Sequence, residues 1–550
     1  MTFLAKWLDN LYFRFLYCSK MFQPIGEVPF SKWGNLPLIV SDYYNKKLGP
    51  QYYKFFPDDE GLYEAITGRK AYPVNRIVLV ESLRKQYSDM LLPESKVAKN
   101  IELLGNETTF TVTTGHQLSL FTGPLYFHYK IITAIKTAQK VEEANPGTKV
   151  VPIFWMASED HDFEEIRKFH LLGKSFEWTN ENSQLPTGRI SLESINEVID
   201  ELKAYFRLPD QSNELVDAFK NAYSNSSNLA EATRKLINDL YGHCGVIAID
   251  ANQKELKELF RPIVELDVMS SLFFQPVLDT SKFLQEAGYK TQVSAREVNF
   301  FYINQGVRER IDKTSEGFIL QLSGRKFSPQ EMNELLQKEI ENFSPNVIMR
   351  PVFQEFILPN IAYVGGPAEV NYWLQLKQAF ERAKVFFPTV LLRYSAVIFK
   401  QKWLDKMELL GLKPEDLLKE KDLLVANWLL SRNVDELDVS IIIADLQRIY
   451  NNLLLKTNDI DKTLAGAIES EKVKSISGIE NIRQKMLKAI KTKESQALLT
   501  VNKLFDNIHP EGNFQERRIN ILEFAQTKSD INDLIEGLNS NNFSIKLLKN

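Results

Sequence analysis

The chain has 550 residues, of which 44% are hydrophobic and 25% charged, a composition that excludes a mostly disordered or fibrous protein. The 67 Lys and Arg residues nearly balance the 71 Asp and Glu residues, and a net charge of −4 gives no electrostatic reason to expect a nucleic-acid partner. Only two cysteines are present, Cys18 and Cys244, which excludes a disulfide framework and favours a cytoplasmic location.

The first twenty residues are apolar but are interrupted by Lys6, Asp9 and Arg14. No small-residue cleavage site follows, so this stretch does not predict a signal peptide. We interpret residues 1–21 as an N-terminal extension, with Met21 as an alternative start. No stretch has the roughly 18 uncharged apolar residues that a membrane span needs, so we expect no membrane partner.

The clearest folding unit lies between residues 110 and 157. Phe110–Thr114 is a short β-rich run, Tyr126–Val141 has apolar residues at helical spacing, and Val150–Ala157 is an apolar run of strand length. This order predicts two parallel strands joined by a helix and buried on both faces. Further strands are predicted at Gly245–Asp250, Asn346–Arg350, Ile361–Val364 and Val385–Leu392.

These elements predict an α/β protein whose open sheet is interrupted by insertions. The predicted divisions are an extension (1–21), core (22–171), a first connecting insertion (172–239), core (240–295), a second connecting insertion (296–345), core (346–395), a helical coiled-coil domain (396–509) and a C-terminal segment that packs back on the core (510–550).

The helical domain is predicted from a change in composition after residue 395, where Pro and Gly become rare. A second apolar stripe extends from Ile479 to Ile508. Such long helices need a partner for their apolar faces, so we expect at least two, antiparallel to each other or paired with another subunit. The first stripe has heptad spacing and consists of Ile442, Leu446, Ile449 and Leu453, continued by Ile460 and Ala467.

Polar residues follow the first strand of the predicted unit, where a parallel sheet places its ligands. Gly115, His116 and Gln117 form this turn, and Gly123 and Tyr126 lie at the start of the following helix, which favours phosphate. The alternative is that His116 is a loop histidine with ordinary hydrogen-bond partners.

An acidic cluster follows the second strand at residues 158–165. It could bind Mg²⁺, orient a cationic or hydroxylated substrate, or supply a general base. The alternative is an acid-rich helix start capped by Asp160 or Asp162. We interpret Glu164 and Glu165 as structural, and expect Glu159, Asp160 and His161 to face the crevice. The spacing does not match a zinc site.

A third group combines Arg350 with the segment 363–369. Gly365 and Gly366 allow close backbone approach to a ligand, and Glu369 could reach a substrate amine. Pro367 is placed to begin a helix that runs through Trp373 and Phe380. The alternative is an ordinary helix start with a Gly-Gly turn. Weaker candidates of the same kind are Arg393 and Tyr394.

Four long segments together carry a family resemblance: TTGHQLSLFTGPLY (113–126), PIFWMASEDHDFEEI (152–166), MRPVFQEFILPNIAYVGGPAEVNYW (349–373) and PEGNFQERRINILEF (510–524). From about residue 22 to its end, the chain resembles the BshC family, the cysteine-adding enzymes of bacillithiol biosynthesis. At His116 it has GHQ in place of the family's commoner GQQ. The resemblance implies a Rossmann-like core similar to class I aminoacyl-tRNA synthetases, two connecting insertions and an antiparallel coiled coil that makes a homodimer.

The resemblance also implies the reaction, which joins the carboxyl group of cysteine to the amine of glucosaminyl-malate. ATP is the expected activating nucleotide, with Mg²⁺, although no KMSKS-like loop is present. The expected catalytic residues are His116, Gln117, Glu159, Asp160 and His161. The expected nucleotide- and substrate-binding residues are Thr114, Gly115, Gly123, Tyr126, Asp162, Arg350, Tyr363, Gly365, Gly366, Glu369 and Arg393.

Two other functions fit the same residues. The acidic cluster could serve a metal-dependent hydrolase or phosphoesterase, and the chain could be a coiled-coil scaffold whose α/β body only binds nucleotide.

Overall fold

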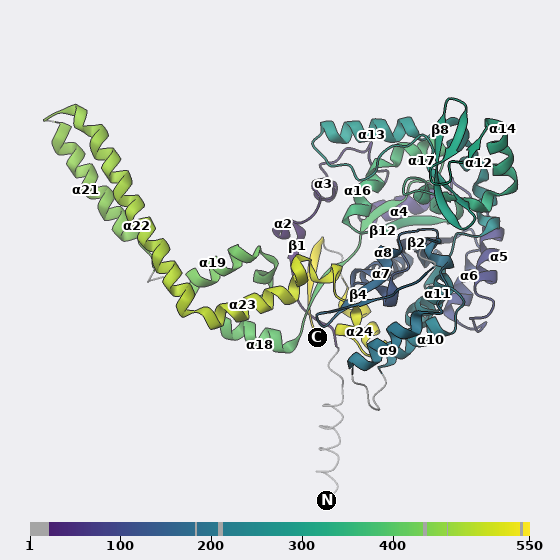
Figure 1. The fold of residues 1–550 in the computed structure, drawn as a ribbon, viewed down its shortest axis with the longest axis horizontal. Helices are drawn as coiled ribbons and strands as arrows, with labels where there is room; N and C mark the ends of the chain where they lie inside the picture. Colours follow the sequence, from purple (N-terminus) through teal and green to yellow (C-terminus); the bar gives the residue numbers. More distant parts are fainter. Residues whose placement is uncertain (1–20, 182–183, 207–212, 433–436, 459, 540–542) are drawn as a thin grey trace, which may run out of the picture. The chain divides into compact units, whose positions relative to one another are not determined.

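The computed structural model describes residues 21–181, 184–206, 213–432, 437–458, 460–539 and 543–550. The chain divides into two compact units (Figure 1). The larger unit contains the residues up to Ile398 together with Glu516–Asn550, and the smaller one contains Phe399–Gln515.

A five-stranded parallel sheet forms the centre of the larger unit, in the spatial order β13-β12-β2-β3-β6. If the five strands are numbered by their order in the chain, they lie across the sheet as 5-4-1-2-3. Read from the opposite edge this is 3-2-1-4-5, the order of a doubly wound sheet. The order reverses between β2 and β12, so the crevice for a ligand is expected there. The strands are β2 (Thr109–His116), β3 (Lys149–Met156), β6 (Ile247–Ile249), β12 (Asn360–Gly365) and β13 (Thr389–Leu392).

The central strands are buried along almost their whole length. The threonines of β2 are buried as well, and Thr111 and Thr113 donate to the side-chain oxygen of Asn360 in β12 (3.0 and 2.8 Å). Helix α7 (Tyr126–Ala144) packs on β2 and β3, and α4 (Asp59–Arg69) packs on β12 and β13. A cluster of buried aliphatic and aromatic side chains joins these two helices to the sheet. The predicted strand–helix–strand unit is confirmed, as are the strands near 247 and 361.

The strand predicted at Asn346–Arg350 is wrong. The side-chain oxygen of Asn346 accepts the backbone N–H groups of Ile348 (2.8 Å) and Met349 (3.1 Å), so the chain turns at this point. It then enters helix α15 (Met349–Ile357), which places Arg350 in the first turn of a helix.

Two other boundaries also differ from the predictions. The run Val385–Leu392 contributes only β13, its last four residues. The helix predicted through Trp373 and Phe380 is two helices, α16 (Pro367–Gln375) and α17 (Lys377–Ala383).

Two long connections interrupt the sheet. Between β3 and β6 lie α8 (Phe163–Ile166), β4 (Lys168–Leu171), β5 (Lys174–Glu177), α9 (Ile195–Phe206), α10 (Glu214–Ser224) and α11 (Leu229–Tyr241). Between β6 and β12 lie α12 (Lys254–Ser270), α13 (Phe274–Glu286), β7 (Phe300–Asn304), β8 (Val307–Thr314), β9 (Gly317–Leu320), β10 (Lys326–Phe327), α14 (Pro329–Lys338), β11 (Phe343–Pro345) and α15. The five strands of the second connection form an antiparallel sheet in the order β10-β9-β8-β7-β11.

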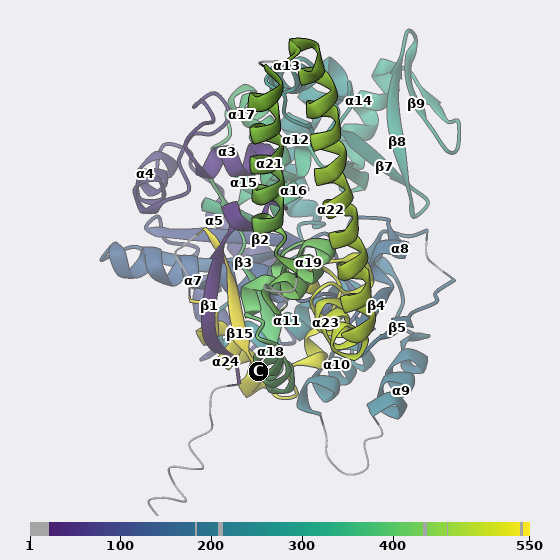
Figure 2. The same cartoon turned by 90° about the vertical axis from the view of Figure 1, so that its left-hand side faces the viewer.

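The two ends of the larger unit meet in a third sheet of order β1-β15-β14, in which β1 and β15 are antiparallel (Figure 2). Its strands are β1 (Gln23–Pro29), β14 (Ser395–Phe399) and β15 (Ser544–Lys549). The remaining helices of this unit are α2 (Phe30–Trp33), α3 (Leu38–Tyr44), α5 (Arg76–Gln86), α6 (Lys96–Leu103) and α24 (Lys528–Gly537).

The smaller unit is helical. Its two long helices, α21 and α22, lie side by side (Figures 1 and 2). Tyr450 hydrogen-bonds Ser475 (2.7 Å), and Lys472 donates to Asn451 (3.3 Å), so the helices run antiparallel. The helices are α18 (Gln401–Leu410), α19 (Lys421–Arg432), α21 (Ser440–Asn458), α22 (Ala465–Lys493) and α23 (Ser495–Ile508).

The predicted heptad stripe is only partly correct. Leu446 is half-buried, but α21 ends before Ile460, which lies in the turn to the next helix, and Ala467 belongs to α22. Three apolar members of the stripe are left exposed in the single chain: Ile442 (50%), Ile449 (58%) and Leu453 (43%).

Candidate functional site

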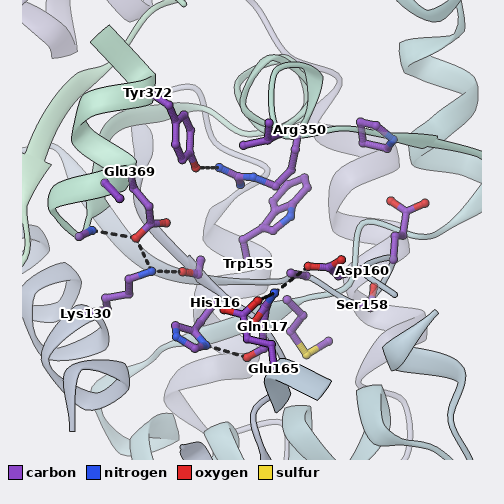
Figure 3. Close-up of a pocket in the computed structure, with 18 of the residues that line it drawn as sticks. His116, Gln117, Lys130, Trp155, Ser158, Asp160, Glu165, Arg350, Glu369 and Tyr372 are labelled. Atoms are coloured by element: carbon purple, nitrogen blue, oxygen red, sulfur yellow. Dashed lines mark hydrogen bonds and ion pairs between the residues drawn. The ribbon is translucent and has the colours of Figure 1, made fainter. Parts of the chain in front are cut away.

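A cavity of about 660 Å³ opens at the carboxyl ends of β2, β3 and β12, where the strand order reverses (Figure 3). We call it the main cavity. It is lined by residues from the sheet, from α7, from both connections and from the C-terminal segment. Eleven residues expected to bind substrate or act in catalysis line it: Gly115, His116, Gln117, Tyr126, Glu159, Asp160, Arg350, Tyr363, Gly366, Glu369 and Arg393.

Five other candidates do not line the main cavity. Thr114 is buried in β2, where its hydroxyl donates to the carbonyl of Val364 (2.9 Å). Asp162 caps helix α8 by accepting the backbone N–H of Glu165 (3.1 Å), as in the structural alternative. The remaining three are Gly123, which has a positive φ of 62°, Gly365 at the end of β12, and His161.

The turn after β2 contains a neutral histidine. Nδ1 of His116 lies 2.9 Å from the carbonyl oxygen of Gln117, so it donates there and leaves Nε2 as an acceptor. Burial, followed by the charge of Lys130, lowers the pKa of His116 to about 3. His116 is therefore neutral at physiological pH.

Gln117 connects the turn after β2 to the acidic cluster after β3. Its amide nitrogen donates to Asp160 (2.8 Å) and to Glu165 (2.7 Å), so both of its N–H groups are bound (Figure 3). The histidine turn after β2 and the acidic cluster after β3 thus share one cavity, as the parallel arrangement of these strands predicts.

A buried ion pair closes the third side of the main cavity. Lys130 of α7 contacts Glu369 of α16 at 2.5 Å and donates to the carbonyl of Gly115 (2.7 Å). Glu369 also accepts the N–H of Gly366 (2.8 Å) and the hydroxyl of Tyr363 (2.6 Å). Burial alone would raise the pKa of Glu369, but Lys130 and these donors outweigh it, so the pKa lies below its usual value. Glu369 is thus ionised and already has protein partners.

The carboxylates of the acidic cluster also have hydrogen-bond and ion-pair partners in the protein. Glu159 pairs with the buried Lys257 (2.5 Å), and Asp160 lies 4.0 Å from Arg308 and accepts the N–H of His161 (2.8 Å). Within the described residues, no group of three His, Cys, Asp or Glu side chains could hold a metal ion. These carboxylates therefore do not fit a Mg²⁺ site of protein ligands alone.

Arg350 has only neutral partners. It donates to the side-chain oxygen of Gln354 (3.0 Å), lies 3.4 Å from the hydroxyl of Tyr372 and sits 5.5 Å from the ring centre of Tyr363. No carboxylate of the described residues forms an ion pair with it. The carboxylate of Glu369 acts on the charge of Arg350 only from beyond ion-pair distance. A partly buried cation without a direct ion pair attracts an anionic ligand, because no carboxylate occupies its hydrogen-bond donors.

Arg393, in contrast, is neutralised by the protein. Its side chain and that of Glu516 are each 4% exposed and form an ion pair at 2.7 Å. Glu516 also accepts the hydroxyl of Ser395 (2.6 Å), and Arg393 donates to the carbonyl of Tyr394 (2.9 Å).

Comparison with known proteins identifies the family. The model of the N-terminal Rossmann-like domain of bacillithiol biosynthesis BshC matches residues 28–394, and that of the BshC C-terminal coiled-coil domain matches residues 396–550. The chain belongs to the BshC family. These two matches confirm the predicted Rossmann-like and coiled-coil fold classes of this BshC-family chain.

Three relatives, each named "Putative cysteine ligase BshC", match along most of their length. The protein of Flavobacterium johnsoniae is 36% identical over 92% of this chain and 96% of its own. That of Cytophaga hutchinsonii is 36% identical over 90% and 93%, and that of Christiangramia forsetii 34% identical over 93% and 96%. A solved structure titled as a "putative arginyl t-RNA synthetase" from Campylobacter jejuni matches at 11% identity over 77% of this chain and 100% of that chain. Its TM-score of 0.21 does not establish a shared fold.

Several cavity residues of this BshC-family chain are not predictable from local motifs. Lys130 had a usable signal, because it is a lysine on the apolar side of the helix after β2. Arg308 comes from the antiparallel sheet of the second connection, and no local pattern brings it to the strand ends. Arg517 lies in the segment 510–524 that carries the family resemblance, and Asn346 lies just before Arg350, but neither was expected at the cavity. No helix in the described part of the chain is long and apolar enough to cross a membrane.

Proposed function

We propose that this chain joins the carboxyl group of L-cysteine to the amine of glucosaminyl-malate, with activation of the carboxyl group by a nucleotide. The proposal rests on membership of the BshC family and on one observation in the main cavity. Arg350, which has no counter-ion among the described residues, lines the same cavity as the carboxylates of Glu159 and Asp160. One cavity thus offers contacts for an anion and for an ammonium group, the two charges that the substrates carry.

The cavity also has the size and charge for a nucleotide. A volume of about 660 Å³ lies in the range of small-molecule sites, which is about 300–1,000 Å³. Five cationic side chains line it: Lys130, Arg308, Arg350, Arg393 and Arg517. Lys130, Arg308 and Arg393 already face protein carboxylates, so the other two are the ones that suit phosphates or carboxylates.

Amide formation from a free carboxylate is uphill in water, and the chemistry that ATP supplies when bound is activation of that carboxyl group. We assign to Arg350 the binding of a malate carboxylate or a phosphate oxygen. Glu159 and Asp160 accept hydrogen bonds from the amino group or the sugar hydroxyls through the lone pairs that Lys257, Gln117 and His161 leave free. His116 and Gln117 line the phosphate side, where the neutral imidazole of His116 presents Nε2 as an acceptor. Mg²⁺, if the reaction needs it, arrives with the nucleotide, since the carboxylates of Glu159 and Asp160 already have protein partners.

The test is turnover by the purified chain. Cysteine, ATP and glucosaminyl-malate are supplied, and bacillithiol, AMP and ADP are measured by mass spectrometry. Bacillithiol with AMP supports activation through an adenylate. Bacillithiol with ADP in place of AMP replaces the adenylate by an acyl phosphate. ATP hydrolysis without bacillithiol contradicts the ligase and favours the hydrolase.

Arg350→Met tests the residue that carries the proposal. A charge-assisted hydrogen bond contributes about 1.5–3 kcal/mol, so KM for an anionic substrate should rise roughly 10- to 100-fold. The fold should be retained, because no carboxylate loses its partner. Arg382→Met, an exposed arginine in the last turn of α17, is the control. Equal KM values for the two variants would remove Arg350 from the site.

We also propose a cytoplasmic homodimer formed through the helical unit. The apolar residues exposed on α21, among them Ile442 and Ile449, support a second copy as the occupant of this face. Ile449→Glu should convert the dimer to a monomer in light scattering after gel filtration. A wild-type chain that is monomeric at micromolar concentration would contradict the proposal.

A further inference from the structure

The C-terminal segment Glu516–Asn520 lies over the connection between β2 and α7, although it is distant in sequence. The backbone N–H of Leu125 donates to the carbonyl of Ile519 (2.8 Å). The side-chain amide of Asn520 donates to the carbonyls of Phe121 (2.8 Å) and Gly123 (2.7 Å). This segment is therefore fixed beside the βα turn that carries His116.

The other end of the segment is fixed as well. Glu516 is bound by Arg393 and Ser395, and its side chain is 4% exposed. The backbone on both sides of Arg517 is thus held by hydrogen bonds and an ion pair, which restricts where the Arg517 side chain can reach.

The side chain of Arg517, unlike the backbone around it, is not held by the protein. Its side chain is exposed and forms no hydrogen bond or ion pair with the described residues, while its charge acts on the hydroxyl of Tyr126. It lines the main cavity and also the two smaller cavities beside it, of about 210 and 260 Å³. An exposed arginine is usually only a solvated side chain, but this one projects from an anchored segment at the junction of three cavities.

We propose that Arg517 is a substrate-binding residue that contacts an oxyanion, either a carboxylate or a phosphate, of a ligand in the main cavity. Its guanidinium has all five donors available, whereas those of Arg393 and Arg308 are largely bound to protein acceptors. Carboxylates and phosphates match this planar set of donors. The inference deepens the proposed function by adding a second anion contact besides Arg350.

The test is a binding measurement that needs no turnover, so it can fail or succeed independently of the proposed reaction. The full chain is titrated with L-malate and, separately, with inorganic pyrophosphate by calorimetry. Arg517→Met should weaken binding of at least one probe about tenfold, and Arg517→Lys should weaken it less, because lysine keeps the charge. Loss for malate alone identifies a carboxylate contact, and loss for pyrophosphate alone identifies a phosphate contact.

Two controls separate binding from folding. The melting temperature of Arg517→Met should equal that of the wild type, since no protein contact is removed. Arg382→Met should bind both probes as the wild type does. Unchanged affinity of Arg517→Met for both probes, or a wild type that binds neither, would overturn the proposal. If Arg517→Met loses affinity while the wild type makes no bacillithiol, the anion contact stands and the ligase function fails.

Discussion

The first prediction concerns how much the ion pair between Lys130 and Glu369, which lines the main cavity, contributes to the stability of the protein. Lys130→Met removes the charge but keeps a long side chain with a similar helix propensity in α7. Glu369, only 22% exposed, would then lose its ion-pair partner and keep only the more distant charges of Arg350 and Arg393, and the carbonyl of Gly115 would lose its donor.

The expected loss of stability follows from this geometry. Breaking a buried ion pair costs about 3–5 kcal/mol, because one charge stays buried without a partner. Glu369 keeps the N–H of Gly366 and the hydroxyl of Tyr363, so we expect about 3 kcal/mol, the lower end of that range. Lys136→Met, in the same helix, should cost about 0–1 kcal/mol, since Lys136 pairs at 3.3 Å with Glu536, which is 59% exposed.

The assay is urea unfolding followed by tryptophan fluorescence, with both single variants and the double variant Lys130→Met, Glu369→Gln. The double variant no longer has an uncompensated charge, so it should be more stable than the sum of the two single losses by about 1–3 kcal/mol. If Lys130→Met loses no more stability than Lys136→Met, or if the losses simply add, the reasoning about this ion pair is refuted.

Two further predictions concern the end of β2 and the effect of pH. A Cβ on Gly115 would lie 3.3 Å from the carbonyl oxygen of Trp155, so Gly115→Ala should shift β2 against β3 by a few tenths of an ångström. A misplacement of about 1 Å can cost about 100-fold in rate, so kcat/KM should fall about tenfold. Gly26→Ala, with its nearest contact at 3.5 Å, should leave kcat/KM unchanged, and equal rates for the two variants would contradict this reasoning. His116 and His128 both have their pKa lowered to about 3 by burial, so the unfolded chain takes up protons first, and stability should fall as the pH decreases from 6.5 towards 3, by up to about 1.4 kcal/mol per pH unit for each histidine. His128→Gln should make the loss in urea midpoint between pH 7 and pH 5 smaller than in the wild type, and an unchanged slope would show that this histidine does not contribute.

The central unit was predictable because β2 is rich in β-branched residues, β3 is an apolar run, and the helix between them has clear apolar spacing. Once β2 and β3 are parallel neighbours, the residues that follow them must meet at one edge, which places His116 and Asp160 together. The strand predicted around Asn346 failed because a side-chain hydrogen bond, which hydropathy does not reveal, turns the chain into α15.

The partners of the site residues were not predictable in the same way. Lys257 and Arg308 reach the acidic cluster from the second connection, and Glu516 reaches Arg393 from beyond the helical unit. These contacts depend on how distant segments fold together. A motif indicates that Glu159 lies at a strand end, but only the fold shows that its charge is already balanced by Lys257.

The pairing of Ser395 and Arg393 with Glu516 has a consequence for how the protein could be rebuilt. Ser395 lies shortly before the chain leaves the larger unit, and Glu516 is the first residue after it returns. Exit and re-entry are therefore tied together by side chains of the larger unit alone. We expect that Phe399–Gln515 can be excised and the gap bridged with a few glycine and serine residues while Arg393 keeps its place in the main cavity. The larger unit could then be produced as a minimal enzyme without the smaller unit.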